Sequence, residues 1–256
     1  MKRVVFFVFA AGSILSCFSE QKRSPNPVFT APAVIPKELI NRINNERDVF
    51  VPALEMLLQE ETQDLLILVD KQHRLPANHV PEELIPLKGG RSYIPNRSGL
   101  SLTKTAEAAL ERMGQAALRD GIKLVVSSSY RSWDYQDNLY ARNVRQLGKE
   151  VADRESAPPG ASQHQLGTVL DFGSITDDFA ETAAGKWLSQ NSSRFGWSLS
   201  FPQGYEVVTG YRWECWHYRY IGMDAAAFQK EWFGDIQQYM LEFIHAWKEW
   251  KEKPLT

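Results

Sequence analysis

Four residues in the C-terminal half have the types and the spacing needed to hold a metal ion and activate water. His164 is followed seven residues later by Asp171, and Glu214 is followed three residues later by His217. A catalytic zinc takes three protein ligands and keeps a fourth position open for water. A further carboxylate beside the metal can take a proton from that water. The best trio of ligands is His164, Asp171 and His217, which leaves Glu214 as the general base.

Each of the two pairs also has an ordinary explanation. A single histidine is more often a surface residue or a hydrogen-bonded core residue than a ligand, so spacing alone leaves both interpretations open. The short interval between Glu214 and His217 adds a condition, because on a regular strand their side chains would point to opposite faces. If both face a metal, the stretch that joins them must form a turn.

The composition is ordinary for a soluble globular protein and argues against nucleic acid as a partner. Of the 256 residues, 43% are hydrophobic and 23% are charged, which is ordinary for a folded domain. The formal net charge is −2, and no basic stripe is present. Both observations argue against a nucleic-acid partner.

The N-terminus has the pattern of an export signal. Two basic residues precede an apolar run over residues 4–15. That run is shorter than the roughly 20 residues that span a bilayer, but it suits a signal peptide. An apolar residue three positions before Cys17 and a small residue directly before it resemble a bacterial lipoprotein cleavage site. We predict a signal peptide over 1–16 and a lipid on Cys17, with ordinary cleavage after Ser19 as the alternative.

The remaining chain divides by composition and periodicity. We predict a proline-rich tether over 17–36, an N-terminal helical segment over 37–64, the main domain over 65–234, and a C-terminal amphipathic helix over 235–256. Helical patterns cover 37–64 with an interruption at Pro52, and then 103–120, 133–147, 178–190 and 235–251. Strand patterns cover 65–69, 122–126, 168–172, 197–200, 206–209 and 218–221. Helices and strands do not alternate regularly, which favours an α+β fold.

Several blocks resemble one protein family. Ser-x-His-x-x-Gly-x-x-x-Asp, beginning at Ser162, and the Glu-x-Trp-His that begins at Glu214 resemble the zinc D-alanyl-D-alanine carboxypeptidases of the VanY type. The blocks at 129–132, 191–202 and 209–211 resemble the same family, and the resemblance covers roughly residues 65–222. It implies the fold of Hedgehog domains and D,D-peptidases, in which helices flank a small antiparallel sheet.

The resemblance also implies roles for single residues. The zinc ligands fall on His164, Asp171 and His217. Glu214 becomes the catalytic base, and Arg131 binds the carboxylate of the substrate or the developing oxyanion. The residues that it implies along the substrate cleft are Tyr130, Gln136, Ser162 and Trp216.

The function that the resemblance implies is zinc-dependent removal of the terminal D-Ala from peptidoglycan stem pentapeptides, in the bacterial cell envelope or periplasm and tethered to the membrane by lipid. An L,D-carboxypeptidase that acts on tetrapeptide stems is one alternative. A non-catalytic zinc-containing lipoprotein that binds the cell wall is another.

A serine mechanism is disfavoured. Ser101-x-x-Lys104 matches the nucleophile motif of penicillin-binding proteins, but the accompanying Lys-Thr-Gly is replaced by Val208-Thr209-Gly210.

Overall fold

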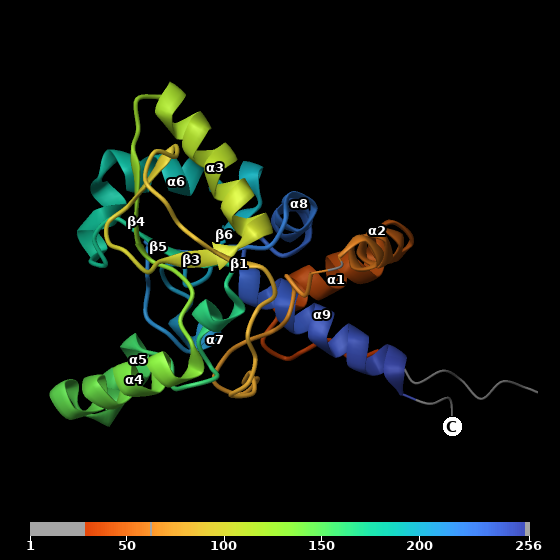
Figure 1. Ribbon diagram of the computed structural model, residues 1–256. Coiled ribbons are helices and arrows are strands. Elements are labelled where there is room, and N and C mark those ends of the chain that lie inside the picture. Colours follow the sequence, from red (N-terminus) through yellow and green to blue (C-terminus); the bar gives the residue numbers. More distant parts are fainter. Residues whose placement is uncertain (1–28, 62, 254–256) are drawn as a thin grey trace, which may run out of the picture.

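The computed structural model describes residues 29–61 and 63–253 (Figure 1). The predicted signal peptide and Cys17 lie outside these residues, as does most of the predicted tether. Within the described ranges, no helix is both long enough and apolar enough to cross a membrane.

A five-stranded mixed sheet forms the centre of the main domain (Figure 1). Its strands, in spatial order, are β2 (Tyr93–Pro95), β4 (Leu124–Ser128), β5 (Val169–Phe172), β7 (His217–Tyr220) and β6 (Trp197–Leu199). Every neighbouring pair is antiparallel except β2 with β4, which is parallel. A separate two-stranded sheet pairs β1 (Leu84–Pro86) with β3 (Ser101–Thr103). The predicted α+β class is therefore confirmed, with one parallel pair at the edge of the sheet.

Helices lie on both sides of this sheet. Figure 1 shows α3 (Lys104–Arg119) and α6 (Ala183–Asn191) on one side, and α4 (Trp133–Leu147) and α5 (Lys149–Glu155) on the other. Successive residues of a strand point to opposite faces. On β5, Leu170 and Phe172 pack into the core formed with Met113 of α3. Asp171 therefore points to the opposite face, where the site is built.

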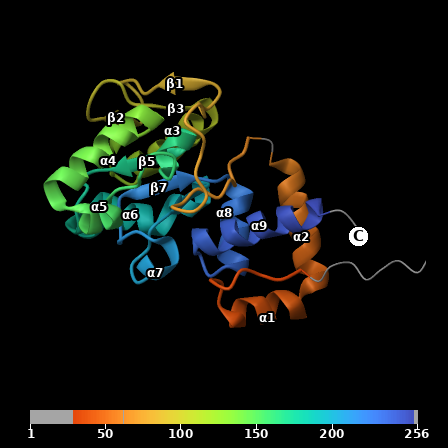
Figure 2. The same cartoon turned by 90° about the horizontal axis from the view of Figure 1, so that it is seen from below.

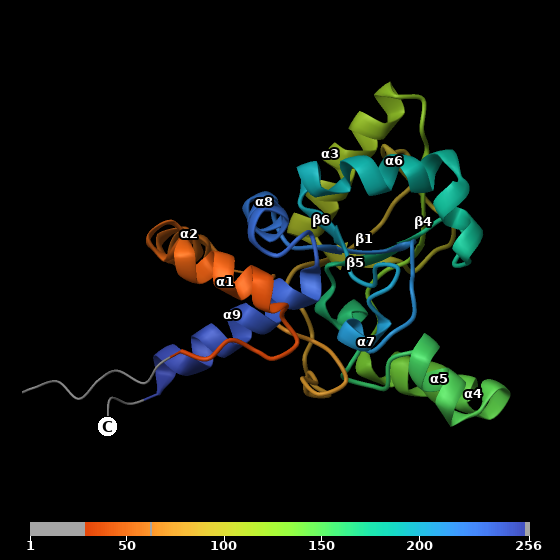
Figure 3. The same cartoon turned by 180° about the vertical axis from the view of Figure 1, so that it is seen from behind.

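A second hydrophobic cluster joins the two ends of the described chain. It contains α1 (Lys37–Asn45), α2 (Arg47–Glu60), α8 (Met223–Trp232) and α9 (Gln237–Glu252). Phe50 of α2 packs edge-on against Phe243 of α9 with ring centroids 5.1 Å apart, and Phe29 packs on the same ring at 5.0 Å. Figures 2 and 3 show these four helices together, on the side of the molecule away from α4 and α5.

Three local predictions from the sequence are wrong. Pro52 lies inside α2, and the helical segment breaks at Glu46 instead. Residues 65–69 form an irregular stretch, because the Leu65 and Ile67 carbonyls accept hydrogen bonds from the Arg219 side chain. Residues 206–209 form a short helix, α7 (Glu206–Thr209).

Serine and threonine caps fix the starts of two helices, as the sequence predicts. The Thr103 hydroxyl accepts a hydrogen bond from the Ala106 N–H at 3.4 Å, at the start of α3. The Ser132 hydroxyl accepts one from the Tyr135 N–H at 3.2 Å, at the start of α4. Each bond satisfies a backbone donor that has no partner within the helix.

We expect Ser132→Ala to lower the free energy of unfolding by about 1 kcal/mol, because the Tyr135 N–H loses its acceptor. Urea denaturation measured by circular dichroism gives the value. Ser132→Thr keeps a hydroxyl at this position and serves as the matched control. Equal stability of the alanine variant and the wild type would contradict a contribution from this cap.

Candidate active site

Two neighbouring strands and a short helical turn bring the three predicted metal ligands together. Asp171 on β5 is the direct antiparallel partner of His217 on β7. Directly opposed residues on one face of a sheet have Cβ atoms about 4.5–5.5 Å apart. His164 comes from a single 3₁₀ turn, Gln163–Leu166, which ends at Gly167 with a φ of 68°. This left-handed conformation favours glycine and lets the chain turn from His164 into β5.

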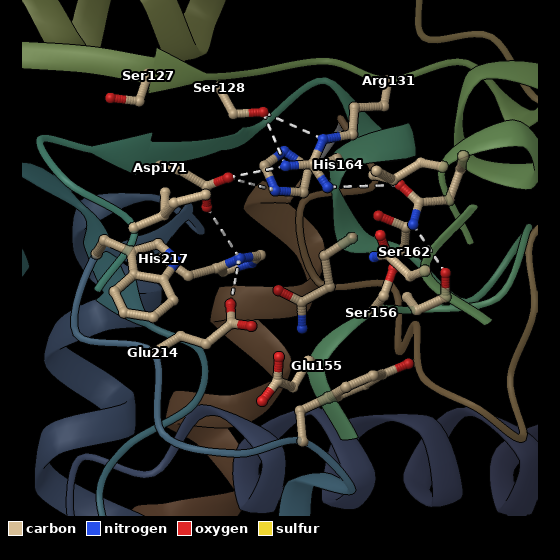
Figure 4. Close-up of a pocket in the computed structure, with 18 of the residues that line it drawn as sticks. Ser127, Ser128, Arg131, Glu155, Ser156, Ser162, His164, Asp171, Glu214 and His217 are labelled. Atoms are coloured by element: carbon tan, nitrogen blue, oxygen red, sulfur yellow. Dashed lines mark hydrogen bonds and ion pairs between the residues drawn. The ribbon is translucent and has the colours of Figure 1, made fainter. Parts of the chain in front are cut away.

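The three side chains form a compact buried cluster (Figure 4). His164 Nε2 lies 3.3 Å from Asp171 Oδ2, and His217 Nδ1 lies 3.3 Å from Asp171 Oδ1. One potential ligand atom from each residue lies within 4.8 Å of the others. All three residues are at most 4% exposed. The sequence prediction that these residues lie together is therefore confirmed.

The donor set fits a metal ion. His164 Nδ1 lies 2.7 Å from the Ser129 carbonyl oxygen, so this nitrogen carries the proton and Nε2 presents its lone pair to the site. Asp171 Oδ1 is buried and has no hydrogen-bond partner. Buried polar atoms without partners are rare, and a cation at this position would satisfy the carboxylate. Two imidazole nitrogens and one carboxylate are a common ligand set for zinc.

The protonation states follow from burial and from the neighbouring charges. Burial and the positive charge of Arg131 lower the pKa of His164 to about 4, so its imidazole is neutral near pH 7. Burial also lowers the pKa of His217, but Asp171 and Glu214 outweigh it and raise that pKa to about 9. Burial raises the pKa of Asp171, but His164, His217 and Arg131 hold it well below its usual value. Asp171 is therefore ionised, as a ligand must be.

We expect the metal-free protein to be most stable near pH 6.5. Below this pH the unfolded chain protonates its histidines while folded His164, with a pKa of about 4, stays neutral, so stability falls toward pH 4. Above it, folded His217, with a pKa of about 9, keeps a proton that the unfolded chain has lost, so stability falls toward pH 9.

Thermal unfolding of chelator-treated protein across this pH range tests the expectation. His164→Gln should flatten the acid side of the profile, and His217→Gln should flatten the alkaline side. Profiles that keep their wild-type shape in both variants would contradict these assignments.

Glu214 lies beside the metal ligands because its segment turns. The His217 N–H donates to the Glu214 carbonyl at 3.2 Å, which closes the turn before β7 begins. The Glu214 N–H donates to the Phe201 carbonyl at 3.0 Å and fixes the other end of the segment. Glu214 Oε2 then lies 3.3 Å from His217 Nδ1. The condition set by the spacing of Glu214 and His217 is met, and a carboxylate stands next to the ligand set.

Arg131 is tied directly to a candidate ligand. Its Nη2 donates to Asp171 Oδ2 at 2.9 Å, and its Nε and Nη2 donate to the Ser128 hydroxyl at 3.1 and 2.9 Å. Its Nη1 lies 3.5 Å from Gln136 Oε1, and Gln136 in turn donates to the Ala157 carbonyl at 2.7 Å. The guanidinium is thus oriented on three sides. Ser128, which sequence reasoning missed, stands at the end of β4, three residues before Arg131.

A cleft of about 750 Å³ opens onto these residues. Most of the predicted site residues line it: Arg131, Gln136, Ser162, His164, Asp171, Glu214, Trp216 and His217. Tyr130 is not among the lining residues, so its role in substrate binding stays a prediction. The cleft is also lined by Phe201 and Tyr211, which sequence reasoning did not place in the site although both fall in blocks of the family resemblance.

The fold and the site together define a class of protein. Two buried imidazoles and a buried carboxylate, with a second carboxylate beside them at an open cleft, are the donor set of a mononuclear zinc enzyme that activates water.

Comparison with known proteins agrees with this class. A family model described as VanY, D-alanyl-D-alanine carboxypeptidase, matches residues 99–223. The putative carboxypeptidase YodJ of Bacillus subtilis (strain 168) is 34% identical over 173 residues, which are 65% of this chain and 63% of YodJ. A D-alanyl-D-alanine carboxypeptidase of Enterococcus faecalis is 30% identical over 192 residues, which are 72% of this chain and 67% of that protein.

Solved structures agree as well. The LdcB LD-carboxypeptidase superposes with a TM-score of 0.64 at 30% identity, covering 71% of this chain and 87% of LdcB. A VanY D,D-pentapeptidase variant in complex with Zn(II) superposes with a TM-score of 0.57 at 30% identity, covering 69% of this chain and 98% of that one. The chain therefore belongs to the VanY family of D-alanyl-D-alanine carboxypeptidases. It spans 63% and 58% of the length of two of the curated relatives that it matches.

Proposed function

We propose that this protein is a zinc-dependent D,D-carboxypeptidase that removes the terminal D-Ala from peptidoglycan stem pentapeptides. The observation that carries the proposal is the buried cluster of His164, Asp171 and His217 with Glu214 beside it, at the bottom of one cleft. The family supports the choice of substrate, since two curated relatives are D-alanyl-D-alanine carboxypeptidases.

Zinc would be held by His164 Nε2, the Asp171 carboxylate and His217 Nδ1. When bound, it supplies a Lewis acid that polarises the scissile carbonyl and makes water a better nucleophile near neutral pH. A VanY relative that contains Zn(II) supports this choice of metal. The ligand set carries one negative charge, so the centre keeps a net charge of +1 and stays electrophilic.

Glu214 and Arg131 then carry out the protein's part of the reaction. Glu214 takes a proton from water as the water oxygen bonds to the carbonyl carbon of the penultimate residue. It returns that proton to the amine of the terminal D-Ala as the C–N bond breaks. The Arg131 guanidinium lies 2.9 Å from Asp171, and its positive charge stabilises the developing oxyanion or the terminal carboxylate of the substrate.

An L,D-carboxypeptidase is the second candidate, supported by the similarity to LdcB. The ligands and the base would be the same, and the two activities differ in the pocket for the residue before the scissile bond. A binding module without catalysis does not explain why Glu214 stands beside an open metal centre. Ser101, the candidate nucleophile of a serine mechanism, lies on β3 and is not among the residues that line the cleft.

The proposal includes export. We infer that residues 1–16 are removed, that Cys17 carries a lipid and that the predicted tether, 17–36, links the folded part to the bacterial membrane, where cell-wall peptides are within reach. Its last residues belong to the folded part, since Phe29 and Ile35 pack in the second hydrophobic cluster. The helical segment 37–64, the zinc carboxypeptidase domain 65–234 and the C-terminal helix 235–256 would then follow outside the cytoplasm. A lipid-sized mass increment that Cys17→Ala abolishes would support this arrangement, and its absence from the wild type would contradict it.

Purified protein incubated with synthetic penta- and tetrapeptide stems tests the activity. Release of D-Ala from the pentapeptide, abolished by chelator and restored by zinc, is the expected result. Release only from the tetrapeptide would favour the L,D activity instead. No release from either peptide by zinc-loaded protein would contradict both. Inhibition by penicillin together with resistance to chelator would point to Ser101.

A further inference from the structure

The cleft extends well beyond the metal ligands along one face of α4. Residues Gln136, Leu139, Arg142, Asn143 and Leu147 of this helix all line it. Apart from the adjacent Arg142 and Asn143, they recur every three or four residues, which places them on one side of the helix. A substrate bound at the metal centre can therefore also contact this face of α4, whose more distant residues are not needed for bond cleavage.

The arginines of this cleft fall into two groups. Arg131 is paired with Asp171, and Arg212 is paired with Asp177 through contacts of 2.5 and 2.7 Å. Arg97 and Arg142 also line the cleft, but neither forms an ion pair or a hydrogen bond with any residue that the structure describes.

The carboxylates of the cleft do not neutralise these two guanidiniums. Asp171 and Glu214 are engaged with the histidines, and Glu155, at the end of α5, forms no ion pair with a described residue. Arg97 and Arg142 are therefore two uncompensated positive charges on the lining of a substrate cleft.

The distance from Gln136 to Arg142 along α4 can be compared with the length of an extended peptide. Gln136 contacts Arg131, which itself contacts the ligand Asp171. Arg142 follows Gln136 by six residues, about 9 Å along the helix axis at about 1.5 Å per residue. An extended peptide advances about 3.3–3.6 Å per residue. Arg142 thus lies about two to three residues of extended peptide beyond Gln136, whose partner Arg131 contacts the ligand Asp171.

We propose that Arg142 binds a free carboxylate that the stem peptide carries at least two residues before its scissile bond. This inference rests on the proposed function. Two groups supply such a carboxylate: the α-carboxylate of a γ-linked glutamyl residue at the second position, and the side-chain carboxylate of a diaminopimelyl residue at the third. A guanidinium suits either, because its planar fork donates two parallel hydrogen bonds to a carboxylate. Arg142 is a specificity determinant, and the bond-breaking steps do not need it.

Pairs of peptides that differ only in one carboxylate test the proposal. One pair of pentapeptide stems carries either the free acid or the carboxamide at the second residue, with lysine at the third. Another pair carries lysine or diaminopimelate at the third residue, with the carboxamide at the second. We expect wild-type kcat/KM to favour one of the two acids by about tenfold, equivalent to about 1.4 kcal/mol, and the favoured acid identifies the source of the carboxylate. Arg142→Gln should reduce this preference to within about twofold by slowing the acid and leaving the amide unchanged.

Arg145→Gln is the matched control, because Arg145 lies on the same helix but not on the lining of the cleft. It should keep the wild-type preference. Calorimetric binding of the same four peptides to zinc-loaded Glu214→Gln protein should show the same preference in affinity without turnover.

The failure of this inference is distinguishable from the failure of the proposed function. Turnover of all four peptides with no preference for either acid, or equal loss on acid and amide in Arg142→Gln, overturns the carboxylate subsite and leaves the carboxypeptidase in place. Absence of turnover from every peptide overturns the proposed function, while the calorimetric comparison still decides whether the cleft prefers the acid.

Discussion

Glu214→Gln will lower kcat/KM for D-Ala release by about 10²–10⁴-fold, the usual contribution of a general base, while the protein keeps one equivalent of zinc. The amide has nearly the shape of the carboxylate, and the turn that ends at His217 is retained because backbone groups of residue 214 close it. It cannot take a proton from water near pH 7. The loss therefore isolates proton transfer from the geometry of the metal centre.

Two measurements are needed to interpret the effect of Glu214→Gln. Elemental analysis of the dialysed protein reports the zinc content, and D-Ala release from the pentapeptide reports turnover. Glu155→Gln is the matched control, since Glu155 lines the same cleft but forms no ion pair or hydrogen bond with the candidate metal ligands among the described residues, and we expect its activity to stay within a few-fold of wild type. Loss of zinc from Glu214→Gln would instead identify Glu214 as a ligand. Wild-type turnover in that variant would mean that another group acts as the base.

Residue types and spacing left the metal site as one of two interpretations, and the resemblance of the surrounding blocks to one family favoured it. A metal needs imidazoles and carboxylates whatever the fold, and few segments of this chain offer them. The spacing of Glu214 and His217 even predicted a turn, because both side chains can face one metal only if the strand begins at His217. The helix caps were predictable for a similar reason, since a hydroxyl at the first position of a helix satisfies a local donor.

Long-range pairing could not be predicted in the same way. Asp171 and His217 are opposed across β5 and β7, but nothing in either segment specifies that register. The amphipathic pattern of 235–251 predicted a helix without indicating that it packs against Phe50 and Phe29 from the start of the described chain.

Tertiary contacts also explain the main error in secondary structure. The apolar run over 65–69 has the composition of a strand. Arg219, which is fully buried on β7, donates from Nη2 to the carbonyls of Leu65 and Ile67 at 2.7 and 2.8 Å. These carbonyls are thereby taken by a side chain from another element, and the segment stays irregular. Local propensity is a weak guide where a distant residue supplies the hydrogen-bond partners.

Asp171→Asn will destabilise the metal-free protein by about 3 kcal/mol or more, the usual cost of removing one partner of a buried ion pair, and will also greatly weaken zinc binding. Asp171 is 3% exposed and is the shared negative partner of Arg131, His164 and His217. The amide keeps the volume of the side chain but leaves the Arg131 charge without a counter-charge.

Comparing the cost in stability of Asp171→Asn with that of Asp177→Asn separates the effect of burial from the effect of forming an ion pair. Asp177 pairs with Arg212 at 2.5 Å, shorter than the 2.9 Å of Asp171 with Arg131, but the Asp177 side chain is 49% exposed and the Asp171 side chain is 4% exposed. Water screens the exposed pair, so we expect Asp177→Asn to cost less than about 1 kcal/mol. Urea denaturation in the presence of chelator gives both values without a contribution from bound zinc. Equal costs for the two variants would mean that burial around the metal centre does not determine what each carboxylate contributes to stability.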